Sequence, residues 1–246
     1  MIPQSFFTKL KLFCDDYKLD SVHGYDHFLA VYNHAIYAIC DMLKYKTISD
    51  NDIKAILYAS LLHDVDDHKL FPKNINHENA RKLLTGVPNE IVYFTLAMIS
   101  LVSCSVNGNS QKGVLFDWML IPRISDRLEA IGQIGIKRAI DYGNRIKRPM
   151  HNTMLTRRAT TEAVLWGIAT EQRFKNYQNG IICDDTTLGH FYDKLLHIGK
   201  VEKWGINNDY LVNVGLQRHQ EVITFVLQYW KDIENKEPNP KYIAYN

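Results

Sequence analysis

The chain has 246 residues, 46% of them hydrophobic, and a formal net charge of +2. This length suits one large domain or two small ones, and the apolar fraction is that of a globular protein with a core. A charge so close to zero gives no electrostatic reason to expect a nucleic-acid partner. The four cysteines form no Cys-x-x-Cys pair, which excludes a zinc ribbon and a thioredoxin-type motif. We therefore expect a reduced, cytoplasmic protein.

The N-terminal sequence does not have the pattern of a signal peptide. The longest mostly apolar run, residues 91–104, is too short to span a bilayer, so no membrane partner is expected. Apolar residues three and four positions apart predict helices through the first half of the chain. These helices cover residues 6–13, 28–43, 50–64, 76–84 and 88–102.

A polar segment at residues 103–113 predicts a loop. Helical spacing returns over residues 115–141, where Pro122 either begins a new helix or kinks the old one. Further helices are predicted at residues 156–174, 186–198 and 209–234. No segment alternates with period two, so the sequence predicts an all-α protein. We expect a single domain over residues 1–246, with its core at about 20–232 and a loosely held tail after about 236.

Several histidines and aspartates occur where the chain is otherwise apolar. His63 and Asp64 end a predicted helix, where burial is costly unless these groups are paired or bound to a metal. The alternative is a helix that ends in solvent with a hydrogen-bonded histidine. His27 is expected to be a ligand with His23 nearby, because four residues separate them. His34 lies on the same helical face, but its pattern favours an ordinary core or surface histidine.

Asp126 stands among isoleucines and leucines and needs a partner, which a metal ion or Arg127 would provide. Arg127 and Arg138 could contact phosphates, or form salt bridges to Glu129 or Asp141. The basic stretch at residues 145–148 is typical of a solvated loop rather than of an RNA-binding surface.

Taken in order, four segments resemble the successive motifs of the HD-domain metal-dependent phosphohydrolases. The resemblance runs from about residue 20 to about residue 232 and is closest to the small stand-alone bacterial-type branch, which includes nucleotide pyrophosphohydrolases. Four motifs in the right order are far more specific than the His-Asp pair alone. The segments are residues 23–27, 62–69, 126–138 and 190–196.

This resemblance implies a helical bundle of the HD-domain type around a central metal site. The expected cofactor is one divalent ion, Mn before Mg, Co, Ni, Fe or Zn. The implied metal ligands are His27, His63, Asp64 and Asp126. Asp64 and Asp67 are the expected catalytic residues, with Asp67 orienting or deprotonating the attacking water. The expected substrate-binding residues are His23, Lys69, Arg138, His190 and Lys194.

The reaction implied by the resemblance is hydrolysis of a nucleoside triphosphate to monophosphate and pyrophosphate. Two alternatives stay open: hydrolysis of another nucleotide (a monophosphate, a cyclic dinucleotide or a guanosine polyphosphate), or a nucleotide-binding regulatory role with little turnover. The protein is expected to be a monomer or homodimer. One position departs from the family pattern, because Ile124 stands where an acidic residue usually precedes the ligand Asp126.

Overall fold

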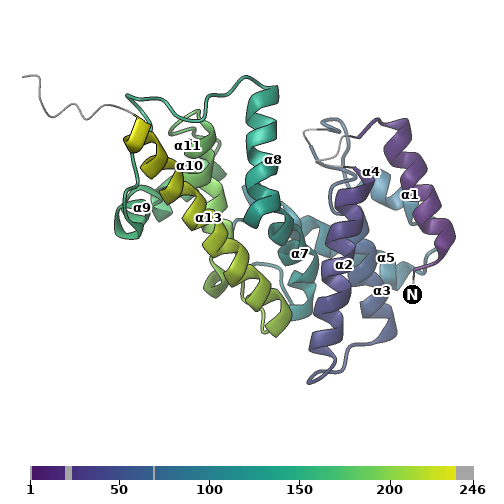
Figure 1. The fold of residues 1–246 in the computed structure, drawn as a ribbon. Helices are drawn as coiled ribbons and strands as arrows, with labels where there is room; N and C mark the ends of the chain where they lie inside the picture. The colour runs from purple at the N-terminus through teal and green to yellow at the C-terminus, as the bar shows by residue number, and fades with distance from the viewer. Residues whose placement is uncertain (1, 20–23, 69, 237–246) are drawn as a thin grey trace, which may run out of the picture. The chain divides into compact units, whose positions relative to one another are not determined.

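The structure is a computed structural model that describes residues 2–19, 24–68 and 70–236. Over these residues all regular secondary structure is helical and no strand is present (Figure 1), which confirms the all-α prediction. The chain divides into two compact units: residues 1–130 with 201–216, and residues 131–200 with 217–246. A single domain over residues 1–246 stays a prediction, and the tail after residue 236 lies outside the described residues.

The first unit contains the N-terminal helices and the start of the last helix. Its α-helices are α1 (Gln4–Asp16), α2 (Tyr25–Met42), α3 (Asp50–Leu62), α4 (Glu78–Leu83), α5 (Asn89–Val102), α6 (Cys104–Asn107) and α7 (Ile121–Ala130). Two 3₁₀ turns, η1 (Asp117–Leu120) and η3 (Val201–Lys203), and the first residues of α13 (Asp209–Lys236) complete it. The predicted helices over residues 6–13, 28–43, 50–64, 76–84 and 88–102 are confirmed, and the predicted loop at 103–113 contains one helical turn, α6.

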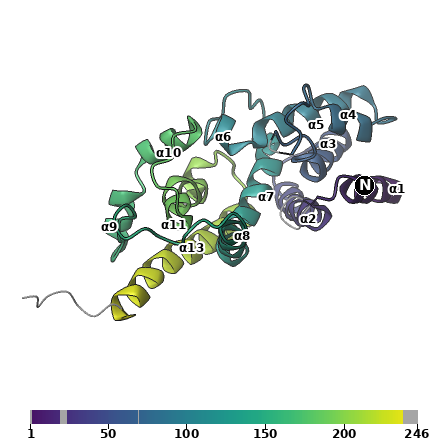
Figure 2. The same cartoon turned by 90° about the horizontal axis from the view of Figure 1, so that it is seen from above.

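Helix α3 occupies the centre of the first unit. It packs against α2, α5 and α7 (Figure 2). Ser49 caps its N-terminus by accepting a hydrogen bond from the Asp52 backbone N–H at 3.1 Å. Every residue from 55 to 62 is buried, because other helices surround this part of α3. The chain therefore reaches His63 inside the unit, so the solvent-exposed helix end considered for this histidine is wrong.

The stretch over residues 115–141, where helical spacing was predicted, forms η1, α7 and a third helix, α8 (Gly132–Arg145). Helix α7 begins at Ile121, so Pro122 lies in its first turn, as expected if it begins a new helix. After α7, Ile131 is extended and Gly132 has a φ of +71°, which glycine adopts without a Cβ penalty. Helix α8 starts there, and the Glu221 carboxylate accepts a hydrogen bond from the Gln133 N–H at 2.9 Å.

The second unit consists of α8, several short helices and the rest of α13. The short elements are α9 (Glu162–Ile168), α10 (Glu171–Gln178), α11 (Thr187–His190), the π-helix η2 (Phe191–Leu195) and α12 (Leu196–Ile198). The predicted helix over residues 156–174 is wrong, because the side chains of Thr161 and Thr170 cap two separate helices. The predictions for residues 186–198 and 209–234 are confirmed.

A buried histidine makes the second unit sensitive to acid. His197 is fully buried, and its ring stacks on Phe174 with ring centroids 4.9 Å apart. Among the described residues, no group makes a hydrogen bond of standard geometry to either ring nitrogen. Burial, followed by the nearby Lys200 charge, lowers the pKa of His197 from 6.5 to about 4.

We expect the free energy of unfolding to fall as the pH is lowered from 6.5 to 4. Over that range the unfolded chain binds a proton at residue 197 and the folded chain does not, whereas above pH 6.5 neither form does. The full effect is ~3 kcal/mol at ~1.4 kcal/mol per pH unit. Urea titrations at several pH values measure it, and His197→Leu should flatten the slope. An unchanged slope in that variant would show that other groups cause the pH dependence.

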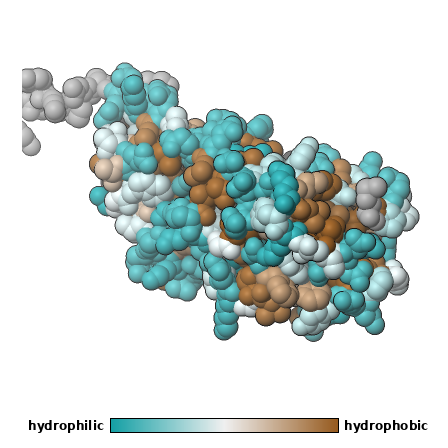
Figure 3. Space-filling model, turned by 90° about the horizontal axis from the view of Figure 1, so that it is seen from below, coloured by the Kyte–Doolittle hydropathy of each residue, from teal (hydrophilic) through white to brown (hydrophobic). Residues whose placement is uncertain are grey.

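The surface carries apolar side chains interspersed with hydrophilic ones (Figure 3). Folded proteins normally keep much apolar surface, so scattered side chains of this kind need no special explanation. Among the described residues no helix combines the length and apolar character that crossing a bilayer requires.

Candidate metal centre

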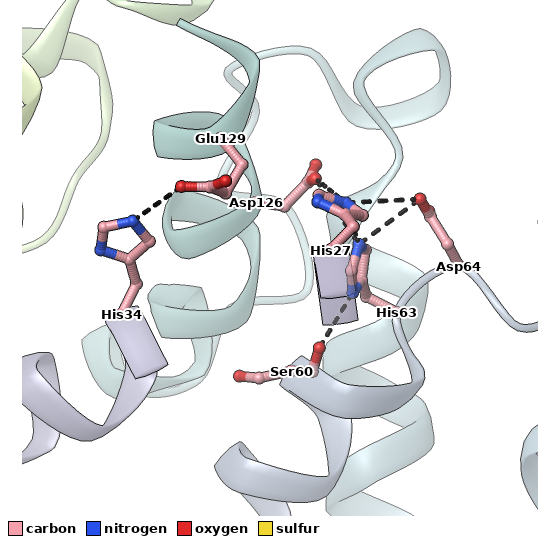
Figure 4. Close-up of polar contacts among 7 residues, drawn as sticks. All are labelled: His27, His34, Ser60, His63, Asp64, Asp126 and Glu129. Atoms are coloured by element: carbon pink, nitrogen blue, oxygen red, sulfur yellow. Dashed lines mark hydrogen bonds and ion pairs between the residues drawn. The ribbon is translucent and has the colours of Figure 1, made fainter. Parts of the chain in front are cut away.

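Four side chains from three parts of the first unit converge on one point (Figure 4). His27 lies in the first turn of α2, His63 and Asp64 follow the last residue of α3, and Asp126 lies in the middle of α7. One ligand atom from each lies within 4.8 Å of the ligand atoms of the other three. The structure therefore brings together all four residues that the sequence motifs predicted as ligands.

The separations between these atoms match those of ligands around one ion. The two imidazole Nε2 atoms are 3.1 Å apart, and Asp126 Oδ1 lies 3.3 Å from His27 Nε2 and 3.5 Å from His63 Nε2. Asp64 Oδ2 is 3.4 Å from His63 Nε2 and 3.9 Å from His27 Nε2. Metal–ligand bonds of ~2.1 Å place neighbouring ligand atoms ~3.0 Å apart at right angles and ~3.4 Å apart in a tetrahedron.

The His63 ring is oriented by the backbone of α3. Its Nδ1 lies 2.9 Å from the Ser60 carbonyl oxygen, which accepts only, so Nδ1 carries the proton and donates it. Nε2 then faces the other three ligands, and loss of its proton leaves the tautomer that a metal-binding histidine needs. Phe28 packs edge-on against the same ring, with centroids 5.5 Å apart.

Opposite charges hold the cluster together. Burial alone would lower the pKa of His63, but the carboxylates of Asp64 and Asp126 raise it well above its usual value. Burial would raise the pKa of Asp126, yet hydrogen bonds from His27 and His63 hold it well below its usual range. Burial would likewise raise the pKa of Asp64, but the charge and hydrogen bond of His63 together with the His27 charge lower it. Two carboxylates thus keep a strong preference for positive charge at this point, which a divalent ion would satisfy in place of protons.

Comparison with known proteins identifies a relative of this chain. No family model matches it. It is 41% identical over 221 residues to the uncharacterized protein L803 of Acanthamoeba polyphaga mimivirus, a match that covers 84% of this chain and 88% of that protein. The chain belongs to the same family as L803.

Solved structures identify the fold. An HD-superfamily hydrolase from Bacillus thuringiensis matches with a TM-score of 0.61 and 22% identity, over 94% of this chain and 96% of that one. Bacillus subtilis YpgQ matches with a TM-score of 0.62 and 19% identity, over 95% of this chain and 98% of that one. YpgQ has also been solved in complex with ADP, and that structure matches with a TM-score of 0.59. The chain has the HD-superfamily fold.

The segment after the HD dipeptide is fixed by Asp66, which the sequence analysis did not single out. Its carboxylate accepts hydrogen bonds from the Asn74 side chain at 2.8 Å and from the backbone N–H groups of Asn79 and Ala80 at 2.9 Å. The Asn79 side chain in turn donates to the Val65 carbonyl at 2.8 Å. The sequence has three aspartates close together, Asp64, Asp66 and Asp67. It gave no indication of which would face the metal site and which would accept hydrogen bonds from the backbone of α4.

Two residues near Asp126 in the sequence, Arg127 and Ile124, are buried in the first unit. Arg127 is 2% exposed and donates to the Asn109 side chain at 2.8 Å and to the Gly108 carbonyl, so it serves the packing of α7 rather than the phosphate contact left open for it. Ile124, which occupies the place of the family's acidic residue, is fully buried. A carboxylate there would need a partner inside the core, which an isoleucine does not.

The structure does not test the roles predicted for the remaining catalytic and substrate-binding residues. Asp67 lies in the turn after Asp64 and is partly exposed. Arg138, His190 and Lys194 belong to the second unit, where the Lys194 ammonium lies 5.8 Å from the centre of the Tyr177 ring. His23 and Lys69 lie outside the described residues. All six assignments stay predictions.

Proposed function

We propose that this chain is a metal-dependent phosphohydrolase that cleaves nucleoside triphosphates to monophosphate and pyrophosphate. The observation that carries the proposal is the cluster of two imidazoles and two carboxylates within bonding range of one ion. The HD-superfamily fold supports a hydrolase, and the ADP complex of the structurally similar YpgQ supports a nucleotide as substrate.

The donor set suits the proposed cofactor. Imidazole nitrogens and carboxylate oxygens suit Mn, the first expectation, and also Fe, Co, Ni or Zn, whereas Mg prefers oxygen ligands. A divalent ion bound here would supply Lewis acidity toward water and toward a phosphoryl oxygen. His27, His63, Asp64 and Asp126 would hold it, with His63 kept in register by its hydrogen bond to the Ser60 carbonyl.

We assign proton transfer to Asp67. Asp67 follows Asp64 by three residues. The hydrogen bonds that Asp66 accepts from the backbone of α4 fix the segment that carries both aspartates. An ionised carboxylate here can accept a proton from the water that attacks the α-phosphorus, while the bond to the β-phosphate breaks and pyrophosphate leaves. His23, Lys69, Arg138, His190 and Lys194 are proposed to bind the remaining phosphates and the nucleoside. The protein is proposed to act in the cytoplasm as a monomer or homodimer.

Product analysis tests the proposal. Metal-stripped protein is given Mn, Mg, Co or Ni and a panel of ribo- and deoxyribonucleoside triphosphates, and the products are separated by chromatography. We expect monophosphate and pyrophosphate in equal amounts, and no product from Asp64→Ala. Release of inorganic phosphate alone would mean that the β–γ anhydride is cleaved instead, and release of nucleoside would mean cleavage of the phosphoester. Tight nucleotide binding without turnover with any of the metals would favour a regulatory role instead.

A further inference from the structure

A histidine that the sequence patterns treated as ordinary is hydrogen-bonded at both ring nitrogens. His34 Nε2 lies 3.0 Å from Glu129 Oε1, and His34 Nδ1 lies 2.7 Å from the Tyr210 hydroxyl (Figure 4 shows the contact with Glu129). The side chains of His34 and Glu129 are only 12% and 6% exposed. Because a carboxylate only accepts, Nε2 donates to Glu129, and Nδ1 pairs with the Tyr210 hydroxyl, which can both donate and accept.

The pair joins the same two helices that supply metal ligands. On α2, His34 follows His27 by seven residues, which is two helical turns along one face. On α7, Glu129 follows Asp126 by three residues and lies on the same side of the helix. Helices α2 and α7 therefore meet twice through polar side chains, once at the ligands and once at His34 and Glu129.

The contact between His34 and Glu129 restricts helix motions that apolar packing alone would permit. Hydrophobic burial is non-directional, so it tolerates small rotations and shifts of one helix against another. A hydrogen bond to a buried carboxylate is directional and short. Rotation of α7 about its axis would move Asp126 and Glu129 together, so the Glu129 contact limits the motion of Asp126 relative to His27.

The histidine is itself held in place from outside the two helices. The Tyr210 backbone N–H donates to Asp41 Oδ2 at 3.2 Å, and the Asn208 side chain donates to the Ala38 carbonyl at 2.8 Å. Both acceptors lie on α2, so the start of α13 is docked on that helix. The Tyr210 hydroxyl is thereby brought to Nδ1 and sets the orientation of the His34 ring.

We propose that His34 and Glu129 are positioning residues of the metal centre, holding α2 against α7 so that His27 and Asp126 keep the separation that one ion requires. The proposal rests on the metal site of the proposed function but not on the reaction assigned to it. Neither residue needs to touch the ion or the substrate.

Cobalt binding tests this directly, because the visible spectrum of Co(II) reports ligand geometry. The wild type is compared with Glu129→Leu, which removes the acceptor, and with Glu129→Gln, whose amide oxygen can still accept from His34. We expect Glu129→Leu to bind Co(II) about 10-fold more weakly, the lower end of what loss of an outer partner costs a metal site, and to show an altered spectrum. Glu129→Gln should recover most of the affinity and the wild-type spectrum.

A matched variant separates positioning from general stability. Ser49→Ala removes the N-terminal cap of α3, so it should lower the melting temperature without changing the α2–α7 contact. Its cobalt spectrum and affinity should match the wild type. If Glu129→Leu keeps both as well, or if Glu129→Gln is as impaired as Glu129→Leu, the positioning role is overturned.

The outcomes also separate this proposal from the proposed reaction. A wild type that binds cobalt with the expected dependence on Glu129 but hydrolyses no nucleoside triphosphate would overturn the reaction and support the positioning role. Hydrolysis that persists while Glu129→Leu binds cobalt normally would do the reverse. A wild type that binds no cobalt would overturn the metal centre and the positioning role together.

Discussion

Asp126→Asn should abolish hydrolysis and weaken Mn binding by at least ~100-fold, beyond what loss of an outer-shell partner costs a metal site. The substitution keeps the shape of the side chain and removes its charge. Asp126 Oδ1 lies 3.3 Å from His27 Nε2 and 3.5 Å from His63 Nε2, so it belongs to the centre of the cluster. Only Asp64 would then balance the charge of a divalent ion in this buried site.

Isothermal titration with Mn and turnover of the best nucleotide measure the two effects. Asp15→Asn is a suitable control, because Asp15 lies exposed at the end of α1 and outside the cluster. It should bind Mn and turn over substrate like the wild type. An Asp126→Asn protein with wild-type affinity for Mn would mean that the ion binds elsewhere and would overturn the ligand assignment.

The sequence motifs selected four side chains that the structure brings together, and three of them sit in a distinctive setting. His63 and Asp64 end an apolar helix, and Asp126 follows a buried isoleucine and serine, so each stands out against its neighbours. His27 was expected as a ligand from its position four residues after His23, and the motif order implied the same role. Helical periodicity likewise predicted α2, α3, α5 and α13 closely, because their apolar faces are long and regular.

Helix boundaries were missed where a single residue changes the backbone direction. The helical spacing predicted over residues 115–141 gave no sign of the break at Ile131 and Gly132, since apolar spacing continues through it. Similarly, Thr170 caps a new helix in the middle of the predicted helix at residues 156–174. A threonine or a glycine is compatible with a helix interior, so sequence spacing cannot tell an interruption from a continuation.

Roles that depend on a distant partner could not be predicted. Glu129 was read only as a salt-bridge partner of an arginine, and its contact with His34, 95 positions earlier in the chain, had no signal in the sequence. Arg127 was a candidate phosphate ligand, but it donates to the segment around Gly108 and Asn109. In both cases the side chain type was read correctly as needing a partner, and only the packing of α7 decided which partner it has.

Gly189→Ala should destabilise the second unit by ~3 kcal/mol, the upper end of the usual cost of overpacking. A Cβ at Gly189 would lie 2.1 Å from the Asp184 carbonyl oxygen and 2.9 Å from its carbonyl carbon. Backbone atoms cannot move aside as a flexible side chain can. Relief would require a shift of the segment before α11, where Thr186 caps the helix by accepting from the Gly189 N–H at 2.9 Å.

That segment is also tied to the loop after α8. The backbone N–H groups of Thr187 and Leu188 donate to the carbonyls of Pro149 and Met150 at 2.9 and 3.0 Å. Moving the turn away from a new methyl group would therefore strain two further hydrogen bonds. Because these bonds and the cap share one short stretch of backbone, the loss should exceed that of an ordinary surface glycine substitution.

Gly167→Ala is the matched test of this argument. Gly167 lies exposed in α9, and a Cβ there would meet nothing within 4 Å. Alanine should stabilise the protein by ~0.5–1 kcal/mol, because it favours a helix and restricts the unfolded chain. Thermal unfolding should thus move in opposite directions for two glycine-to-alanine changes in the same unit. Equal melting temperatures for the two variants would show that the turn before α11 accommodates a methyl group without cost.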